Sequence, residues 1–260
     1  RRISQGYSMN CSGSPAAVAN GSAPAGRRNS IVVPVRLPGV RRGIHMTDLF
    51  ASALHLDRAA VKALKISDAY SLHRVVYSLF ADARTDREKC SHISSGIAYA
   101  DQGGDFHGRK ILIVSDRPPA AKVDGLYGEV ISKSIPAAFL SHSRYRFQVQ
   151  VNPVRKDKQT GKRVAVKGRA DIAQWFIQRA ASRWGFDVDL PGLQVEAMEV
   201  LQFKDKAGRQ VTLGKATVQG LLTVTDRQKF QHSFHHGIGK GRAFGCGLLQ
   251  IVPVVDALFS

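Results

Sequence analysis

The sequence predicts an α+β protein in which two ferredoxin-like βαββαβ units lie side by side, the first of them carrying a helical insertion. Three observations lead to this prediction. In the second half of the chain, strand-like and helix-like hydrophobic patterns follow each other in the order β-α-β-β-α-β, which defines a ferredoxin-like unit. The first half gives an imperfect version of the same order. Between the halves, around residues 135–143, a proline and several small residues indicate a domain boundary.

The first unit is expected over residues 29–137, after a flexible basic arm of residues 1–28 that is rich in Ser, Ala, Gly and Asn. Its first strand is expected at residues 31–38, where Pro34 favours a sheet edge or a bulge. A helical insertion over about residues 41–66 is expected to separate this strand from the next helix.

That next helix begins at Ser67 or Asp68, because either side chain can cap a helix N-terminus. Apolar residues recur every three or four positions after it, which predicts one buried face. Tyr70, His73 and Tyr77 share the flank beside that face. The remaining strands of the first unit are expected at residues 96–101, 110–115 and 126–132.

The second unit is expected over residues 144–260. Apolar and polar residues alternate over residues 145–151, which is typical of a half-buried strand. A basic hairpin-like loop follows at residues 152–169, and an amphipathic helix at residues 171–184. The elements that complete the unit are strands near residues 195–203 and 216–224, a helix capped by Thr225 in a capping box with Gln228, and a strand at residues 248–254.

The charge balance points to a polyanionic partner, because the 260 residues carry a net charge of +18. No apolar run approaches the length of a membrane span, and the cations are spread over loops and helices, so nucleic acid is favoured over a membrane surface. The three cysteines, Cys11, Cys90 and Cys246, are too widely spaced for a disulfide framework or a zinc site. With no signal-peptide pattern either, we expect a cytoplasmic protein.

The most distinctive stretch is a glycine-rich loop at residues 237–247, where five glycines alternate with Lys240 and Arg242. Glycine permits positive φ and close approach to a ligand, and successive N–H groups can form an anion-binding concavity. The loop matches neither a Walker A loop nor a dinucleotide fingerprint. We predict that Gly239, Lys240, Gly241 and Arg242 bind phosphate groups. The alternative is a tight turn whose cations are solvated.

Residues 237–249 resemble the C-terminal glycine-rich motif of the CRISPR repeat-RNA-processing endonucleases, most closely the CasE branch of the RAMP superfamily. The resemblance spans about residues 66–254. Further stretches similar to that family are residues 145–147 running into Asn152-Pro153, residues 163–166 leading to Trp175 and Arg179, and residues 70–73 followed by Leu79-Phe80.

Two features differ from the CasE pattern. A long basic arm precedes the first expected strand, and the helical insertion separates that strand from the first helix of the family. In these features the chain is more similar to the related processing nucleases of type IV CRISPR systems.

The resemblance implies a metal-independent endoribonuclease that cleaves CRISPR repeat RNA at the base of its stem-loop. The 2′-hydroxyl attacks the adjacent phosphate and leaves a 2′,3′-cyclic phosphate and a 5′-hydroxyl. His73 suits general acid–base catalysis, and Tyr70 would orient the 2′-hydroxyl or the phosphate. Arg242 and Lys240 would stabilise the developing negative charge, and Arg36 is a further candidate. No cofactor or metal is expected, because the acidic residues are few and scattered.

Most of the expected RNA contacts are cations outside the loop. In the basic hairpin they would bind the phosphates of an A-form stem, whose shape is read rather than its sequence. The resemblance also implies that the protein stays on the mature crRNA and joins other CRISPR effector subunits. The expected RNA-binding cations are Arg41, Arg42, Lys62, Lys65, Arg155, Lys156, Lys158, Lys162, Arg163, Lys167 and Arg169.

Other interpretations stay open. A non-catalytic RNA-binding subunit of a CRISPR ribonucleoprotein would have the same charge and the same loop. A protein bound to ribosomal RNA would share the charge, whereas a phosphate-binding metabolic enzyme would need a nucleotide motif. Without the resemblance, His73 is a structural histidine. His235-His236 are expected to stabilise a helix C-terminus through its dipole and to take no part in the chemistry.

Overall fold

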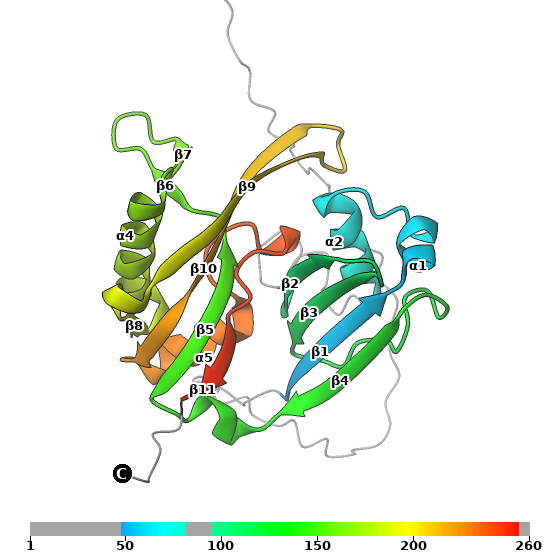
Figure 1. Ribbon diagram of the computed structural model, residues 1–260, viewed down its shortest axis with the longest axis horizontal. Coiled ribbons are helices and arrows are strands. Elements are labelled where there is room, and N and C mark those ends of the chain that lie inside the picture. The colour runs from blue at the N-terminus through cyan, green and yellow to red at the C-terminus, as the bar shows by residue number, and fades with distance from the viewer. Residues whose placement is uncertain (1–47, 82–94, 255–260) are drawn as a thin grey trace, which may run out of the picture. The chain divides into compact units, whose positions relative to one another are not determined.

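The computed structural model describes residues 48–81 and 95–254 (Figure 1). Predictions that concern the arm at residues 1–28, the strand at residues 31–38, or Arg36, Arg41 and Arg42 lie outside the described residues. None of the helices in the described part of the chain is long and apolar enough to cross a membrane.

The first unit is built on an antiparallel four-stranded sheet. Its strand order is β2-β3-β1-β4. Strand β3 therefore lies between β1 and β2, which splits the β1–helix–β2 crossover as a ferredoxin-like unit requires. The strands are β1 (Leu49–Leu56), β2 (Ile97–Gly104), β3 (Arg109–Ser115) and β4 (Glu129–Ile135).

The expected helical insertion is wrong for residues 49–56, which form β1. Ser52, Leu54 and Leu56 are buried at every second position, and β1 pairs with β3 on one side and β4 on the other. Leucine and alanine favour a helix in isolation, but two neighbouring strands outweigh this local preference. The insertion was one of the two features expected to differ from the CasE pattern. Residues 49–56 do not show this difference, because they form a strand.

Two helices cover one face of this sheet. The short helix α1 (Arg58–Ala63) begins at Asp57, and α2 (Ala69–Ser78) begins at Asp68, which forms a reciprocal capping box with Ser71. The prediction of Asp68 as a cap is confirmed. The buried side of α2 packs on the sheet core, which includes Leu54, Tyr99 and Ile111. Residues 116–128, all of them described, contain no helix, so the first unit has a loop in place of its second crossover helix.

The second unit has the strand order β11-β5-β10-β8, and β9 pairs with the far part of β10. The same split crossover recurs, because β10 lies between β5 and β8. Strand β8 has three residues and was not predicted. The strand expected at residues 216–224 is β10, which begins six residues earlier, at Gln210. The strands are β5 (Arg144–Val151), β8 (Phe186–Val188), β9 (Gln194–Lys204), β10 (Gln210–Val224) and β11 (Gln250–Pro253).

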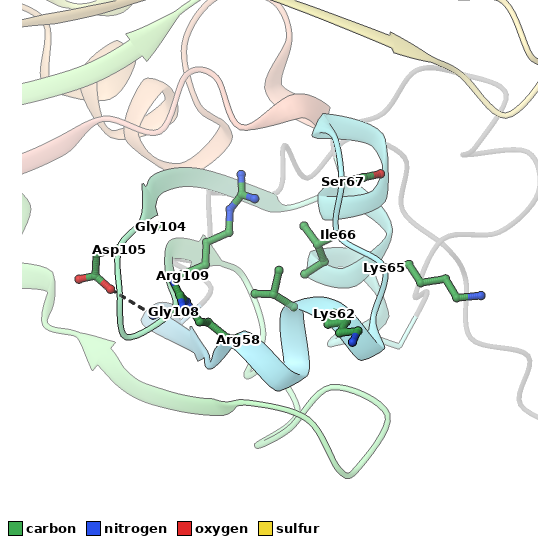
Figure 2. Close-up of a pocket in the computed structure, with 10 residues that line it drawn as sticks. Arg58, Lys62, Lys65, Ile66, Ser67, Gly104, Asp105, Gly108 and Arg109 are labelled. Carbon is green, nitrogen blue, oxygen red and sulfur yellow. Dashed lines mark hydrogen bonds between the residues drawn. The ribbon is translucent and has the colours of Figure 1, made fainter.

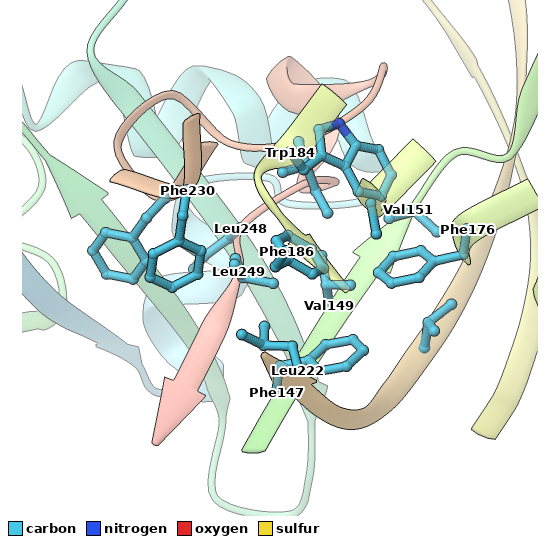
Figure 3. Close-up of a cluster of buried hydrophobic side chains, with 14 of the residues drawn as sticks. Phe147, Val149, Val151, Phe176, Trp184, Phe186, Leu222, Phe230, Leu248 and Leu249 are labelled. Carbon is cyan, nitrogen blue, oxygen red and sulfur yellow. The ribbon is translucent and has the colours of Figure 1, made fainter. Parts of the chain in front are cut away.

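Two helices, α4 (Arg169–Arg179) and α5 (Arg227–His236), pack on alternate buried residues of β5. Figure 3 shows the aromatic centre of this core, where the rings of Phe147 and Phe176 stack with centroids 5.6 Å apart. A π-helical turn (Ala180–Trp184) extends α4. The helix start expected at Thr225 is wrong by one residue: the Asp226 carboxylate accepts the Lys229 N–H at 3.0 Å, as the more effective cap.

The two units share a core. A short 3-10 helix (Ala137–Leu140) joins β4 to β5 in the region of the expected boundary. Ala98, Ala100 and Val114, on the face of the first sheet away from α2, belong to the apolar cluster of the second unit. The Gln150 side-chain amide donates to the Asp101 carbonyl at 2.9 Å. The first sheet is therefore covered on both faces.

Candidate active site and nucleic-acid interface

The glycine-rich loop needs its glycines. Gly237, Gly239, Gly241, Gly245 and Gly247 all have positive φ, between 72° and 88°. A Cβ at Gly247 would stand 2.2 Å from the Ile238 carbonyl oxygen, whereas a Cβ at Gly239 would meet nothing within 4 Å. The loop is therefore a specific backbone conformation and not a generic flexible turn.

Much of the loop backbone is already hydrogen-bonded within the protein. The Ile238 N–H donates to the Gly247 carbonyl at 2.8 Å, and the Gly247 N–H donates to the Gln150 carbonyl of β5 at 2.6 Å. The N–H groups of Phe244 and Cys246 both donate to the Gly241 carbonyl. These four N–H groups cannot serve the anion-binding concavity that the glycine pattern predicted.

The loop also rests on the first unit. Tyr99 of β2 is fully buried, and its hydroxyl donates to the Ala243 carbonyl at 2.8 Å. Burial raises the pKa of Tyr99 far above its ordinary value, so the phenol stays protonated and keeps donating. A Cβ at Gly245 would come within 3.2 Å of the Tyr99 ring. Both units therefore fix the position of the loop.

The loop meets the predicted catalytic residues through Phe244. Phe244 belongs to the short 3-10 helix η4 (Arg242–Phe244). Its ring centroid lies 5.9 Å from that of His73. On α2 the His73 ring is flanked by Tyr77 at 4.2 Å and Tyr70 at 6.2 Å. Tyr70 packs on the small cluster formed by Phe203, Leu213 and Cys246. The structure thus brings His73 and Tyr70 against the glycine-rich loop.

Arg242 has a structural role that the sequence did not indicate. Its guanidinium Nη1 donates to the carbonyl of His236, the last residue of α5, at 2.8 Å. Burial lowers the pKa of His236 to about 4, and burial also lowers that of His235, so both imidazoles are neutral near pH 7. The expectation that the two histidines serve the helix dipole as cations is therefore wrong, and Arg242 supplies that charge.

Lys240 links the loop to the basic hairpin. It is exposed and forms a β-bridge with Asn152, which lies just before β6 (Val154–Lys156). The predicted hairpin is confirmed, because β6 pairs with β7 (Arg163–Ala165). Its turn is closed by Asp157, whose carboxylate accepts the Thr160 N–H at 2.7 Å. The exposed cations of this hairpin and its flank are Arg155, Lys156, Lys158, Lys162, Arg163, Lys167 and Arg169.

Three of the predicted RNA-binding cations differ from the rest in their surroundings. The Arg169 guanidinium donates to the carbonyls of Val195 and Glu196 on β9, so it is partly committed to the fold. Lys62 and Lys65 are exposed on the first unit, where they line a separate pocket with Arg109.

Lys215 is a largely buried cation near the site that was not among the predicted residues. Its side chain is only 11% exposed, and its ammonium lies 3.2 Å from the Glu199 carboxylate on the paired strand. It shares a face of β10 with Leu213, two residues away, and this alternation was a signal for a half-buried position. Cys246 nearby is fully buried, and burial raises the pKa of its thiol to about 12, so it is no nucleophile near pH 7.

Within the described ranges, no three His, Cys, Asp or Glu side chains are grouped closely enough to hold a metal ion.

Comparison with known proteins agrees with this fold. Residues 49–253 match the family model described as "CRISPR associated protein". The CRISPR-associated endoribonuclease Cse3 of Thermus thermophilus is 31% identical over 147 residues, which are 52% of this chain and 69% of Cse3.

Two solved structures are similar in fold. The structure of Thermus thermophilus Cse3 bound to an RNA that represents a pre-cleavage complex gives a TM-score of 0.64 at 22% identity, over 79% of this chain and 100% of that chain. A chain of a CRISPR RNA-guided surveillance complex gives 0.56 at 19% identity, over 79% and 100%. The predicted fold class, two ferredoxin-like units, is confirmed by these matches and by the two sheets.

Proposed function

The chain belongs to the family of CRISPR-associated proteins, and on this premise we propose that it is an endoribonuclease that binds the stem-loop of CRISPR repeat RNA and cleaves at its base. One observation carries the proposal. His73 and Tyr70 of the first unit lie against Phe244 of the glycine-rich loop, which belongs to the second unit. A titratable ring, a phenol and a cation-bearing loop together are what phosphodiester cleavage by a neighbouring hydroxyl needs.

In the proposed reaction, the 2′-hydroxyl at the cleavage position attacks the adjacent phosphorus. Its proton passes to a base, the P–O bond to the 5′ oxygen breaks, and that oxygen takes up a proton. His73 carries out proton transfer, and Tyr70 orients the 2′-hydroxyl or the phosphate. The products are a 2′,3′-cyclic phosphate and a 5′-hydroxyl, and the scheme uses no metal ion.

Two cations of the loop have different tasks in this scheme. Lys240 is exposed and contacts the RNA phosphates directly. Arg242 holds the end of α5 with one nitrogen, and its other N–H groups have no acceptor among the described residues. These N–H groups stabilise the negative charge that develops on the phosphate.

The β6–β7 hairpin binds the stem. Its cations are exposed on a short protruding ribbon, which suits contact with the phosphates of an A-form duplex. The protein then keeps the mature crRNA and joins other CRISPR subunits. This last proposal is supported by the similar fold of a chain in a surveillance complex.

The test is cleavage of a labelled repeat stem-loop in EDTA by wild type and His73→Ala. We expect His73→Ala to bind the RNA as wild type does and to cleave at least about 100-fold more slowly, as loss of a general acid or base does. The matched control is His55→Ala, which removes an exposed histidine from β1 of the same unit.

Each other outcome has a definite meaning. Full activity of His73→Ala would remove His73 from the mechanism. Loss of wild-type activity in EDTA would refute the metal-free scheme. A wild type that binds the stem-loop tightly but never cleaves it would identify a non-catalytic RNA-binding subunit instead.

A further inference from the structure

A second basic site lies in the first unit, between α1 with the segment after it and the turn that joins β2 to β3 (Figure 2). The pocket has a volume of about 430 Å³, within the range of pockets that hold small molecules. Its lining comes from two segments that are separated in the chain by the whole of α2. The residues that carry the argument are Arg58, Lys62, Lys65, Gly108 and Arg109.

The pocket is strongly positive. Arg58, Lys62 and Lys65 form no ion pair with any described residue. Arg109 pairs with Asp101, which lies outside the lining, through an Nε–Oδ1 hydrogen bond of 3.1 Å. Because this hydrogen bond favours the charged form, it raises the pKa of Arg109 and keeps the guanidinium protonated.

One carboxylate, that of Asp105, belongs to the same lining. Its Oδ1 accepts the N–H groups of His107 and Gly108 at 2.8 and 3.1 Å, so it is used in closing the turn. Figure 2 shows the carboxylate on the outer side of the turn, pointing away from Lys62 and Lys65. Arg109 is balanced by Asp101, so the three cations Arg58, Lys62 and Lys65 outnumber the one carboxylate of the lining.

An exposed aromatic ring stands on the same turn. Phe106 is 76% exposed, and the Arg58 guanidinium lies 4.8 Å from its ring centroid. Such a ring can stack with a nucleobase, and the arginine beside it adds a cation–π contact. The turn packs closely on β1, because a Cβ at Gly108 would stand 2.1 Å from the Leu56 carbonyl oxygen. The ring therefore stands on a turn that lies against the sheet.

This combination differs from the β6–β7 hairpin, which offers cations on a ribbon without an aromatic side chain. A pocket of this size cannot admit a duplex, but it can admit one nucleotide whose base has left the stack. We propose that the pocket and Phe106, which stands on the same turn but outside the lining, together bind an unpaired nucleotide in the single-stranded segment next to the stem, with the phosphate at Arg58, Lys62 and Lys65 and the base on the Phe106 ring. The proposal rests on the proposed function, which supplies an RNA that has such a segment.

The test compares three RNAs on the full chain: the bare repeat stem-loop, the stem-loop with a single-stranded extension on its 5′ or its 3′ side, and an unstructured oligonucleotide of the extension sequence. Binding is followed by fluorescence anisotropy for wild type, Phe106→Ala and the double variant Lys62→Gln/Lys65→Gln. All three substituted side chains are exposed, so the variants should fold, and thermal unfolding checks this. The matched controls are Leu126→Ala and Lys122→Gln, an exposed apolar residue and an exposed cation in the loop before β4.

We expect one of the two extensions to tighten wild-type binding by at least about tenfold, in line with base stacking on an aromatic ring. Both pocket variants should lose this gain. Phe106→Ala should bind the bare stem-loop as wild type does, and Lys62→Gln/Lys65→Gln should weaken binding of the extended RNA more than binding of the bare stem-loop. The controls should keep the gain.

The inference is overturned if neither extension tightens binding, or if the pocket variants weaken binding of the bare stem-loop as much as that of the extended RNA. A wild type that ignores the bare stem-loop would instead refute the proposed function. In that case the affinity for the unstructured oligonucleotide still tests the pocket. Equal affinity of wild type and Phe106→Ala for it would refute the inference.

Discussion

The glycine-rich loop is held from both units, whereas the β6–β7 hairpin is held at its base alone by the residues that the structure describes. The loop is hydrogen-bonded to β5 through Gly247 and to β2 through Tyr99. The hairpin is tied down by the indole N–H of Trp175, which donates to the Val154 carbonyl at 3.1 Å, and its cations extend into solvent. Both segments are rich in cations, but their surroundings give them different tasks. A fixed loop can position a reacting phosphate, and a protruding hairpin adds charge and affinity.

The largest expected effect tests whether the loop needs its fixed conformation. Gly247→Ala would place a Cβ 2.2 Å from the Ile238 carbonyl oxygen, and Gly239→Ala would place one in open space. Both residues have positive φ, so both variants should lose about 1 kcal/mol to the backbone conformation. Gly247→Ala should lose a further ~2 kcal/mol or more to the clash, together with most of the cleavage activity. Urea unfolding measures the difference, and equal losses in the two variants would show that the close approach is not restrictive.

The next effect tests the task assigned to the hairpin. The triple variant Lys158→Gln/Lys162→Gln/Arg163→Gln removes three exposed cations from the hairpin. We expect weaker binding of the stem-loop, and a slope of log affinity against log salt that is shallower by roughly one for each phosphate that the variant no longer neutralises. Cleavage at saturating RNA should be unchanged. Lys122→Gln is the control, and a triple variant with unchanged salt dependence would exclude the hairpin from the interface.

A smaller effect separates the loop support from ordinary stabilisation. Tyr99 and Tyr145 are both fully buried, and each hydroxyl donates to a carbonyl at 2.8 Å, that of Ala243 and that of Phe139 respectively. Tyr99→Phe and Tyr145→Phe should each lower the free energy of unfolding by about 1 kcal/mol. Only Tyr99→Phe should also slow cleavage, because only Tyr99 supports the loop. Equal cleavage rates for the two variants would show that the loop does not depend on this hydrogen bond.

The smallest effect concerns pH and the histidine at the end of α5. The pKa of His236 is lowered from 6.5 to about 4, chiefly because the ring is buried. The neighbouring His235, His232 and Arg242 lower it further, and Asp116 acts in the opposite direction. Between pH 6.5 and about pH 4, the imidazole of His236 is protonated in the unfolded chain but not in the folded chain. The free energy of unfolding therefore falls as the pH falls through this range, and His236 has no effect on it above the range.

This prediction is measured by urea unfolding at pH 7 and pH 5.5. The wild type should be less stable at pH 5.5, and His236→Gln should show a smaller difference between the two conditions. The control His55→Gln should behave as wild type. Equal pH dependence of stability in wild type and His236→Gln would contradict the buried, neutral state of His236.

Several elements could be predicted from local sequence because the residues that define them are neighbours in the chain. The alternation of apolar and polar residues over residues 145–151 predicted β5, and Asp68 predicted the start of α2. The glycine spacing indicated where the loop backbone could take positive φ, since a residue without a Cβ permits this conformation. The residues around β1 could not be predicted in this way, because two partner strands decide their conformation.

The candidate site divides in the same manner. Local sequence was enough to identify the parts of the site: a histidine and a tyrosine on one flank of a capped helix, a loop of glycines and cations, and a basic hairpin. Three contacts depend on the folded arrangement: Phe244 lies beside His73, Arg242 donates to the last carbonyl of α5, and Tyr99 donates to Ala243, a residue 144 positions away. Such contacts leave no periodicity in the chain. They arise because the buried faces of two units have to fill one core, which fixes every segment attached to them.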